Sequence, residues 1–213
     1  MTELDLTPLE KDLATEMFNL GMNRAAYALS HMTAGPIEIS IPEINISNFE
    51  TVAKQFPQGD VCVVAQSIEG AFDGTALLIF SDDESLHVVE QIMGGNISRE
   101  IIHEISEDAL KEVGNIVLNA CVGSMANWLS LSFEVGLPEF IEGPIVKLFT
   151  MMGYDDTAVA LDIKISLRLP RHNSGGTLSL VLGPVSLLQF KALLAAKLAE
   201  IGAQPAAVER APS

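Results

Sequence analysis

The amino-acid sequence predicts an α+β fold in which two similar helix–strand units share one largely antiparallel sheet. Three observations predict it: long helical patterns alternate with short apolar stretches, hairpin turns instead of crossover helices join the strands, and this order occurs twice. Two units of this size bury more apolar surface together than apart. We therefore expect a single pseudo-two-fold domain over residues 1–202, with repeats at about 7–97 and 103–201.

The first unit opens with a long helix predicted from Thr7 to about Ser30. Thr7 can cap the helix, Pro8 suits its first position and Glu10 can complete a capping box. The helix is expected to end before the Gly35-Pro36 pair.

Apolar stretches predict the rest of the first unit. Three strands are expected, at 37–46, 59–68 and 75–80. The segment 72–74, Phe-Asp-Gly, is a hairpin signal between the last two. Acidic residues 82–84 favour the start of a helix that runs to Met93, and the glycine pair 94–95 ends it.

The second unit repeats this order. Its predicted elements are a helix at 106–128, strands at 133–137, 145–150, 158–169 and 177–182, and a helix at 185–201. Gly175-Gly176 is expected to form the turn that corresponds to 72–74, with about six residues inserted near 149–156. Residues 203–213 are rich in alanine and proline and are predicted to be disordered.

The two long helices and the segments after them carry the same polar signature. Five residues of the first copy recur 96 positions later: Asp12, Glu16, Asn19, Asn23 and Pro42 become Asp108, Glu112, Asn115, Asn119 and Pro138. The spacing of the first four places them along one face of a helix. Any amphipathic helix has a polar face, which would explain either stripe alone. Duplication favours a specific task, because asparagine is a poor helix former and yet recurs at both places.

This signature resembles the active-site motif of the CheC/CheX/FliY family of bacterial chemotaxis phosphatases. The motif Asp/Ser-x3-Glu-x2-Asn-x22-Pro occurs here twice, and the repeat covers nearly all of residues 7–200. Two intact copies resemble CheC more than CheX, which carries one site. The resemblance implies two adjacent motif-bearing helices in an enzyme that hydrolyses the aspartyl phosphate of a phosphorylated CheY-like response regulator.

The resemblance also implies roles for the motif residues. Glu16 and Glu112 would each form a salt bridge with a lysine of the regulator, while Asn19 and Asn115 would orient the attacking water. A neutral amide is no strong base, but it can hold a water in line, as glutamine does in GTPases. The Mg²⁺ belongs to the partner receiver, so no cofactor of the chain's own is expected. A CheD-like protein is a second candidate partner.

The remaining motif residues are expected to support the site. Proline in or beside a strand indicates an edge or a break, and acids near a helix start suit its dipole. The supporting set is Asp12, Asn23, Pro42, Asp108, Asn119 and Pro138. The two copies differ at one position: Gly114 precedes Asn115, as is usual in the family, whereas Phe18 precedes Asn19. A ring where a partner's backbone approaches predicts a weaker first site.

Composition excludes several classes of function. The formal net charge of −16 repels phosphate backbones and anionic membrane surfaces, which argues against both as partners. Cys62 and Cys121 lie in apolar runs and are expected to be buried. No secretory pattern opens the chain, so a cytoplasmic location is expected.

Other catalytic or binding sites have little support. The four histidines show neither metal-ligand spacing nor a paired nucleophile, and the acidic residues 82–84 are explained by a helix start, so no metal site is predicted. The competing hypothesis is a non-catalytic module that binds a response regulator or a CheD-like protein, or a flagellar-switch scaffold.

Overall fold

Helices and strands follow the same order in the two halves of the chain. The computed structural model describes residues 5–32, 36–56, 60–94, 98–153, 159–168 and 173–203. The first half contains α1 (Pro8–Ser30), β1 (Glu38–Asn48), α2 (Phe49–Lys54), β2 (Val61–Gly70), β3 (Gly74–Ser81) and α3 (Asp82–Ile92). The second half contains α4 (Arg99–Leu129), β4 (Phe133–Val135), β5 (Glu139–Gly143), α5 (Ile145–Met151), β6 (Val159–Arg168), β7 (Asn173–Leu182) and α6 (Pro184–Ala203).

The described strands form one seven-stranded sheet, and all of their pairings are antiparallel. The strand order is β1-β6-β7-β3-β2-β4, and β5 also pairs with β2. Exchanging each strand for its counterpart in the other half reverses this order and leaves it otherwise the same, with β4 and β5 together in the place of β1. Since β3 pairs with β7 at the centre, both halves contribute to one sheet, and the α+β fold is confirmed.

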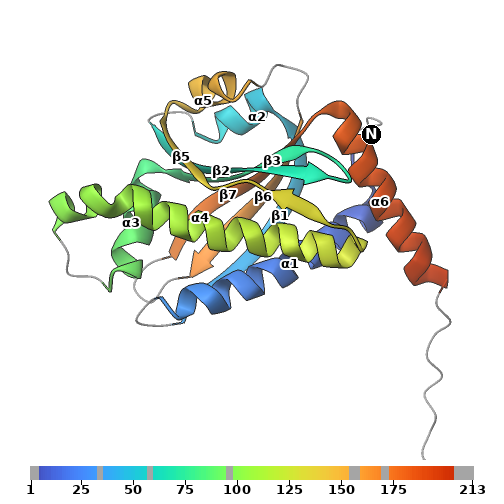
Figure 1. Cartoon of the computed structure of the whole chain (residues 1–213), viewed down its shortest axis with the longest axis horizontal. Coiled ribbons are helices and arrows are strands. Elements are labelled where there is room, and N and C mark those ends of the chain that lie inside the picture. Colours follow the sequence, from blue (N-terminus) through green and yellow to red (C-terminus); the bar gives the residue numbers. More distant parts are fainter. Residues whose placement is uncertain are drawn as a thin grey trace, which may run out of the picture.

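The two faces of the sheet are covered by different helices (Figure 1). Helices α1, α3, α4 and α6 bury the larger apolar core against one face, where alternate β2 residues such as Val64 and Ile68 point. The short helices α2 and α5 cover the other face, toward which Val61 and Val63 point. Among the helices on the first of these faces, the long helices α1 and α4 lie side by side.

The start of α1 agrees with its sequence signals. The Glu10 N–H donates to the Thr7 hydroxyl at 3.3 Å, and the Thr7 N–H donates to the Glu10 carboxylate at 2.7 Å, which completes the capping box. The predicted strands at 37–46, 59–68 and 75–80 correspond to β1, β2 and β3 within a few residues, although residues 57–59 lie outside the described ranges.

Several predicted boundaries in the second half are wrong. Helix α4 begins at Arg99 instead of Ser106, because Ser98 caps it by accepting a hydrogen bond from Ile101 N–H at 3.5 Å. The predicted strand at 145–150 is the helix α5, in which Ile145, Leu148 and Phe149 are buried at helical spacing. Helix α2 and strand β5 were not predicted, since runs this short fit either pattern.

The second hairpin also differs from its prediction. Gly175 and Gly176 lie within β7 and pair with β6, so the predicted turn at these glycines is wrong, and residues 169–172 lie outside the described ranges. Gly176 is needed for another reason: a Cβ there would lie 2.8 Å from the ring of Phe80. Residues 204–213 of the predicted tail, and residues 154–156 of the predicted insertion, also lie outside the described ranges.

Candidate functional site

Helices α1 and α4 pack closely and run in opposite directions. The Ser124 hydroxyl donates to the Met17 carbonyl at 2.6 Å, and a Cβ on Gly21 would lie 2.8 Å from the Ala120 carbonyl oxygen. Residue numbers rise along one helix as they fall along the other, so the helices are antiparallel. The glycine at Gly21 permits this close backbone approach. The helix pair therefore presents both motif stripes on one layer of the molecule (Figure 1).

The two motif stripes are exposed to the same extent, position by position. In each copy the acids and the second asparagine are exposed, and the first asparagine is half-buried; the residues are Asp12, Glu16, Asn19 and Asn23, and Asp108, Glu112, Asn115 and Asn119. Exposed carboxylates beside a half-buried amide form a surface that another protein can reach. Asp108 lies well inside α4, so its predicted place near a first helical turn is wrong.

The side chain of Asn115 is held by two donors. The Gln66 Nε2 group donates to Asn115 Oδ1 at 3.4 Å, and the Asn119 Nδ2 group donates to the same oxygen at 2.6 Å. Asn119 therefore supports Asn115 from the next turn of the same helix. Gln66 lies on β2 and is buried, with 2% of its surface exposed. The sequence contains one sign of this role, a single amide side chain within the apolar run 61–68, but it was not among the predicted site residues.

Pro138 lies at an interruption of the edge strand beside β2. Strand β2 pairs with β5 through Val61–Ala65 and with β4 through Ile68–Gly70, so Gln66 lies opposite the gap between them. At this gap Gln66 Nε2 also donates to the Gly136 carbonyl at 3.2 Å. The predicted break at Pro138 is confirmed. Because of this break, the Gly136 carbonyl can accept a hydrogen bond from Gln66, the residue that also contacts Asn115.

Pro42 lies at the corresponding irregularity on the other edge. The pairing of β1 with β6 shifts register between Ser40 and Glu43, which is a β-bulge that contains Pro42. The described residues of β6 that face the helix layer are apolar and have no hydrogen-bonding side chain: Val159, Leu161, Ile163 and Ile165. Among the described residues, Asn19 has no hydrogen bond corresponding to that between Gln66 and Asn115.

The positions before the two asparagines both face the core. Phe18 is buried with 2% of its surface exposed. Gly114 is buried against β2, because a Cβ there would lie 2.4 Å from Val64 Cγ1. Neither residue points toward solvent, so the expectation that Phe18 obstructs an approaching partner is wrong. Gly114 instead lets α4 approach β2 closely.

Other chemistries find little support in the described parts of the chain. Burial raises the pKa of the thiols of Cys62 and Cys121, so the predicted buried cysteines are confirmed and neither is an activated nucleophile. Among the described residues, no group of three or more His, Cys, Asp or Glu side chains could hold a metal ion. No helix in these ranges is long and apolar enough to span a bilayer.

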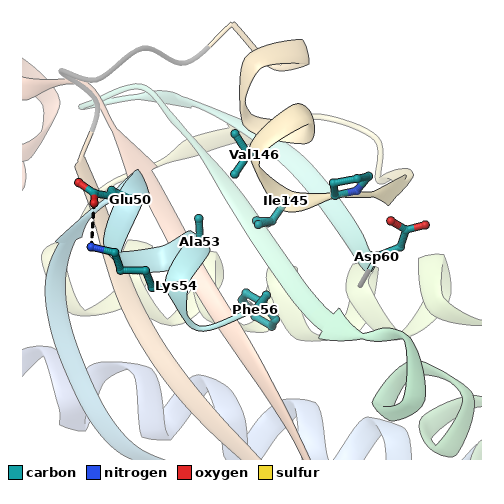
Figure 2. Close-up of a pocket in the computed structure, with 8 residues that line it drawn as sticks. Glu50, Ala53, Lys54, Phe56, Asp60, Ile145 and Val146 are labelled. Atoms are coloured by element: carbon teal, nitrogen blue, oxygen red, sulfur yellow. Dashed lines mark ion pairs between the residues drawn. The ribbon is translucent and has the colours of Figure 1, made fainter. Parts of the chain in front are cut away.

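A hollow of about 520 Å³ lies on the opposite face of the sheet, between α2 and α5 (Figure 2). Its lining includes Ala53, Phe56 and Ile145, and Lys54 forms an ion pair with Glu50 at 2.7 Å on its rim. An exposed pair of this kind contributes little stability. The motif residues are separated from this hollow by the sheet, so the candidate site is an open surface of α1 and α4.

Comparisons with known proteins identify similar chains. The chain is 24% identical over 136 residues to the flagellar motor switch phosphatase FliY of Bacillus subtilis, covering 63% of this chain and 36% of that protein. It is 23% identical over 135 residues to the CheY-P phosphatase CheC of the same organism, covering 61% and 65%. The chain thus spans about a third of FliY and under two thirds of CheC. No family model matches the chain.

Solved structures share the fold. FliY of Thermotoga maritima superposes with a TM-score of 0.73 at 20% identity, covering 90% of this chain and 98% of that one. The middle domain of FliM from Vibrio alginolyticus superposes with a TM-score of 0.60 at 16% identity, covering 84% and 99%.

Proposed function

We propose that the chain is a member of the CheC/CheX/FliY family and a phosphatase that hydrolyses the aspartyl phosphate of a CheY-like receiver domain. The observation that supports this most is the pair of exposed Glu–Asn constellations on α1 and α4, each matching the family motif. The names of the similar proteins FliY and CheC, a motor switch phosphatase and a CheY-P phosphatase, support the same activity.

The motif residues divide the work between docking and positioning. Glu112 and Glu16 are exposed carboxylates, suited to an ion pair with a lysine of the receiver. Asn115 and Asn19 lie one helical turn further along the same face, where an amide reaches toward the phosphorylated group. The amide orients water for in-line attack on phosphorus, the bond between phosphorus and the aspartyl oxygen breaks, and inorganic phosphate leaves with the proton from water.

Charge favours a protein substrate with a cationic contact point. The chain carries 28 acidic and 12 basic residues, and its motif helices present carboxylates at the surface. A receiver domain would bring its own Mg²⁺ to counter the charge of the phosphoryl group, and this chain would supply the acidic and amide groups. The chain requires no resident metal in this reaction, and the proposed setting is chemotaxis or another two-component system in the cytoplasm.

A phosphate-release assay tests this function. The substrate is a CheY-like receiver phosphorylated in Mg²⁺, and the measured quantity is the rate of phosphate loss with and without the chain. The chain is expected to accelerate the loss, and the double substitution Asn19→Ala/Asn115→Ala is expected to remove the acceleration. Full acceleration by the double variant would refute the assignment of the two asparagines.

A binding or scaffold role is the second candidate, and the fold shared with the FliM middle domain favours it. In that role the chain binds a phosphorylated receiver or a CheD-like protein without catalysis. Titration calorimetry with the phosphorylated receiver separates the two functions. Tight binding with an unchanged rate of phosphate loss would favour the scaffold.

A further inference from the structure

We propose that Gln66 is a positioning residue, which fixes the orientation of the Asn115 carboxamide by linking it to the backbone carbonyl of Gly136. This inference rests on the proposed phosphatase function, because it assigns a supporting residue to that site. It applies to the α4 site alone.

The orientation of Gln66 is set by the backbone. The Gly136 carbonyl can only accept a hydrogen bond, so the group of Gln66 that faces it at 3.2 Å must be the Nε2 donor. The edge strand is interrupted at this point, which leaves the Gly136 carbonyl free of the ladder to β2. Gln66 is buried beneath α4, so its amide has little freedom to turn.

The orientation of Asn115 follows from that of Gln66. The second N–H of Gln66 Nε2 points to Asn115 at 3.4 Å, and the Asn119 amide donates from the next turn at 2.6 Å. Both neighbours are donors, so Asn115 must turn its oxygen toward them. Its Nδ2 group, which makes no hydrogen bond among the described residues, is left to contact a water or a phosphoryl oxygen. An amide held this way loses less entropy when the reacting groups assemble.

A second observation indicates that Gln66 is retained for function. Its Oε1 atom is buried and has no hydrogen-bond partner among the described residues. An unsatisfied buried oxygen costs stability, which an apolar side chain at this position would avoid. Ile163 and Ile165 fill the corresponding face of β6 without that cost. Local rules of packing are broken most often where a site requires it.

Kinetics test the proposal in a chain whose first site is disabled. In an Asn19→Ala background, Gln66→Met keeps the volume and removes both donors. We expect kcat for phosphate release to fall about tenfold with KM for the receiver nearly unchanged, because docking by Glu112 is untouched. Gln91→Met is the matched control: it removes another buried glutamine amide, on α3, with no contact to Asn115 among the described residues, and it should leave kcat unchanged.

Nuclear magnetic resonance supplies a readout that needs no substrate. The Asn115 side-chain amide of the full chain is expected to have a high ¹⁵N order parameter, which falls in Gln66→Met and not in Gln91→Met. Unchanged order with unchanged kcat would overturn the proposal, and so would lost order with unchanged kcat. Failure of the unsubstituted chain to hydrolyse a phosphorylated receiver would instead refute the proposed function, and the order parameter would still decide whether Gln66 holds Asn115.

Discussion

The motif regions of α1 and α4 carry the same residues at the same spacing and exposure, yet the sheet supports them differently. Beneath α4, Gln66 reaches Asn115 and ties it to the broken edge strand. On the other side, α1 packs against β1, and β6, the counterpart of β2, presents apolar residues such as Ile163 and Ile165 to the helix layer. The difference teaches that a repeated surface motif specifies which groups meet a partner, whereas the layer below specifies how firmly those groups are held.

The residues before the two asparagines explain part of this difference. Gly114 carries no side chain, so α4 lies against Val64 of β2 and Asn115 comes within reach of Gln66. Phe18 instead places a buried ring in the core at the corresponding position of α1. The α4 site therefore remains the stronger candidate, but for a reason that lies within the protein and not in how a partner approaches.

The largest effect is expected from Phe18→Ala. Removing a buried ring leaves a cavity, so the free energy of unfolding should fall by about 3–5 kcal/mol. Urea denaturation followed by circular dichroism measures it. Leu20→Ala on the same helix is the control, because Leu20 is 39% exposed and should lose far less. Equal losses in the two variants would show that Phe18 does not anchor α1.

Separate substitution of the two catalytic candidates comes next. Asn115→Ala should slow phosphate release about 100-fold, because a well-positioned group contributes effects of that size. Asn19→Ala should leave the rate nearly unchanged, since no group of the sheet holds Asn19 among the described residues. Equal losses of rate at the two sites, or a larger loss at Asn19, would show that the α4 site is not the more active of the two.

Glycine substitutions within α4 test the close approach of the helix to the sheet. Gly114→Ala forces a methyl group against Val64 and should lower the free energy of unfolding by about 1–3 kcal/mol. Gly123→Ala meets no atom within 4 Å and should raise stability by up to about 1 kcal/mol, as alanine favours helix. Thermal denaturation of both variants measures their stabilities relative to the unsubstituted chain. Stabilisation by both would contradict the tight contact at Gly114.

The smallest effect is expected from Asn119→Ala. This substitution removes one of two donors to Asn115, and an exposed neutral hydrogen bond contributes only about 0.5–1.5 kcal/mol. Phosphate release should therefore slow by about threefold. Asn23→Ala, the matched change on α1, should have no measurable effect on the rate. A larger loss from Asn23 would show that the α1 stripe also depends on its second asparagine.

Much of the fold was predictable because its signals are local. The cap at Thr7, the alternation in β1 and the acidic start of α3 each lie within a few consecutive residues. The misses were also local: Ile145–Met151 is too short for its apolar pattern to distinguish helix from strand, and two serines compete as caps near the start of α4. The turn at Gly175-Gly176 was misplaced because glycine there makes room for Phe80.

The sequence by itself determined the surface chemistry of this protein. It specifies two helices that each carry an acid–amide stripe, a proline after each helix that interrupts a strand, and a net charge that disfavours nucleic acid. Only the tertiary structure decided which asparagine is held in place. Gln66 and Asn115 are 49 residues apart and Gln66 and Gly136 are 70 apart, so neither contact has a local pattern. Such contacts exist because the sheet packs beneath α4, and packing depends on the whole chain at once.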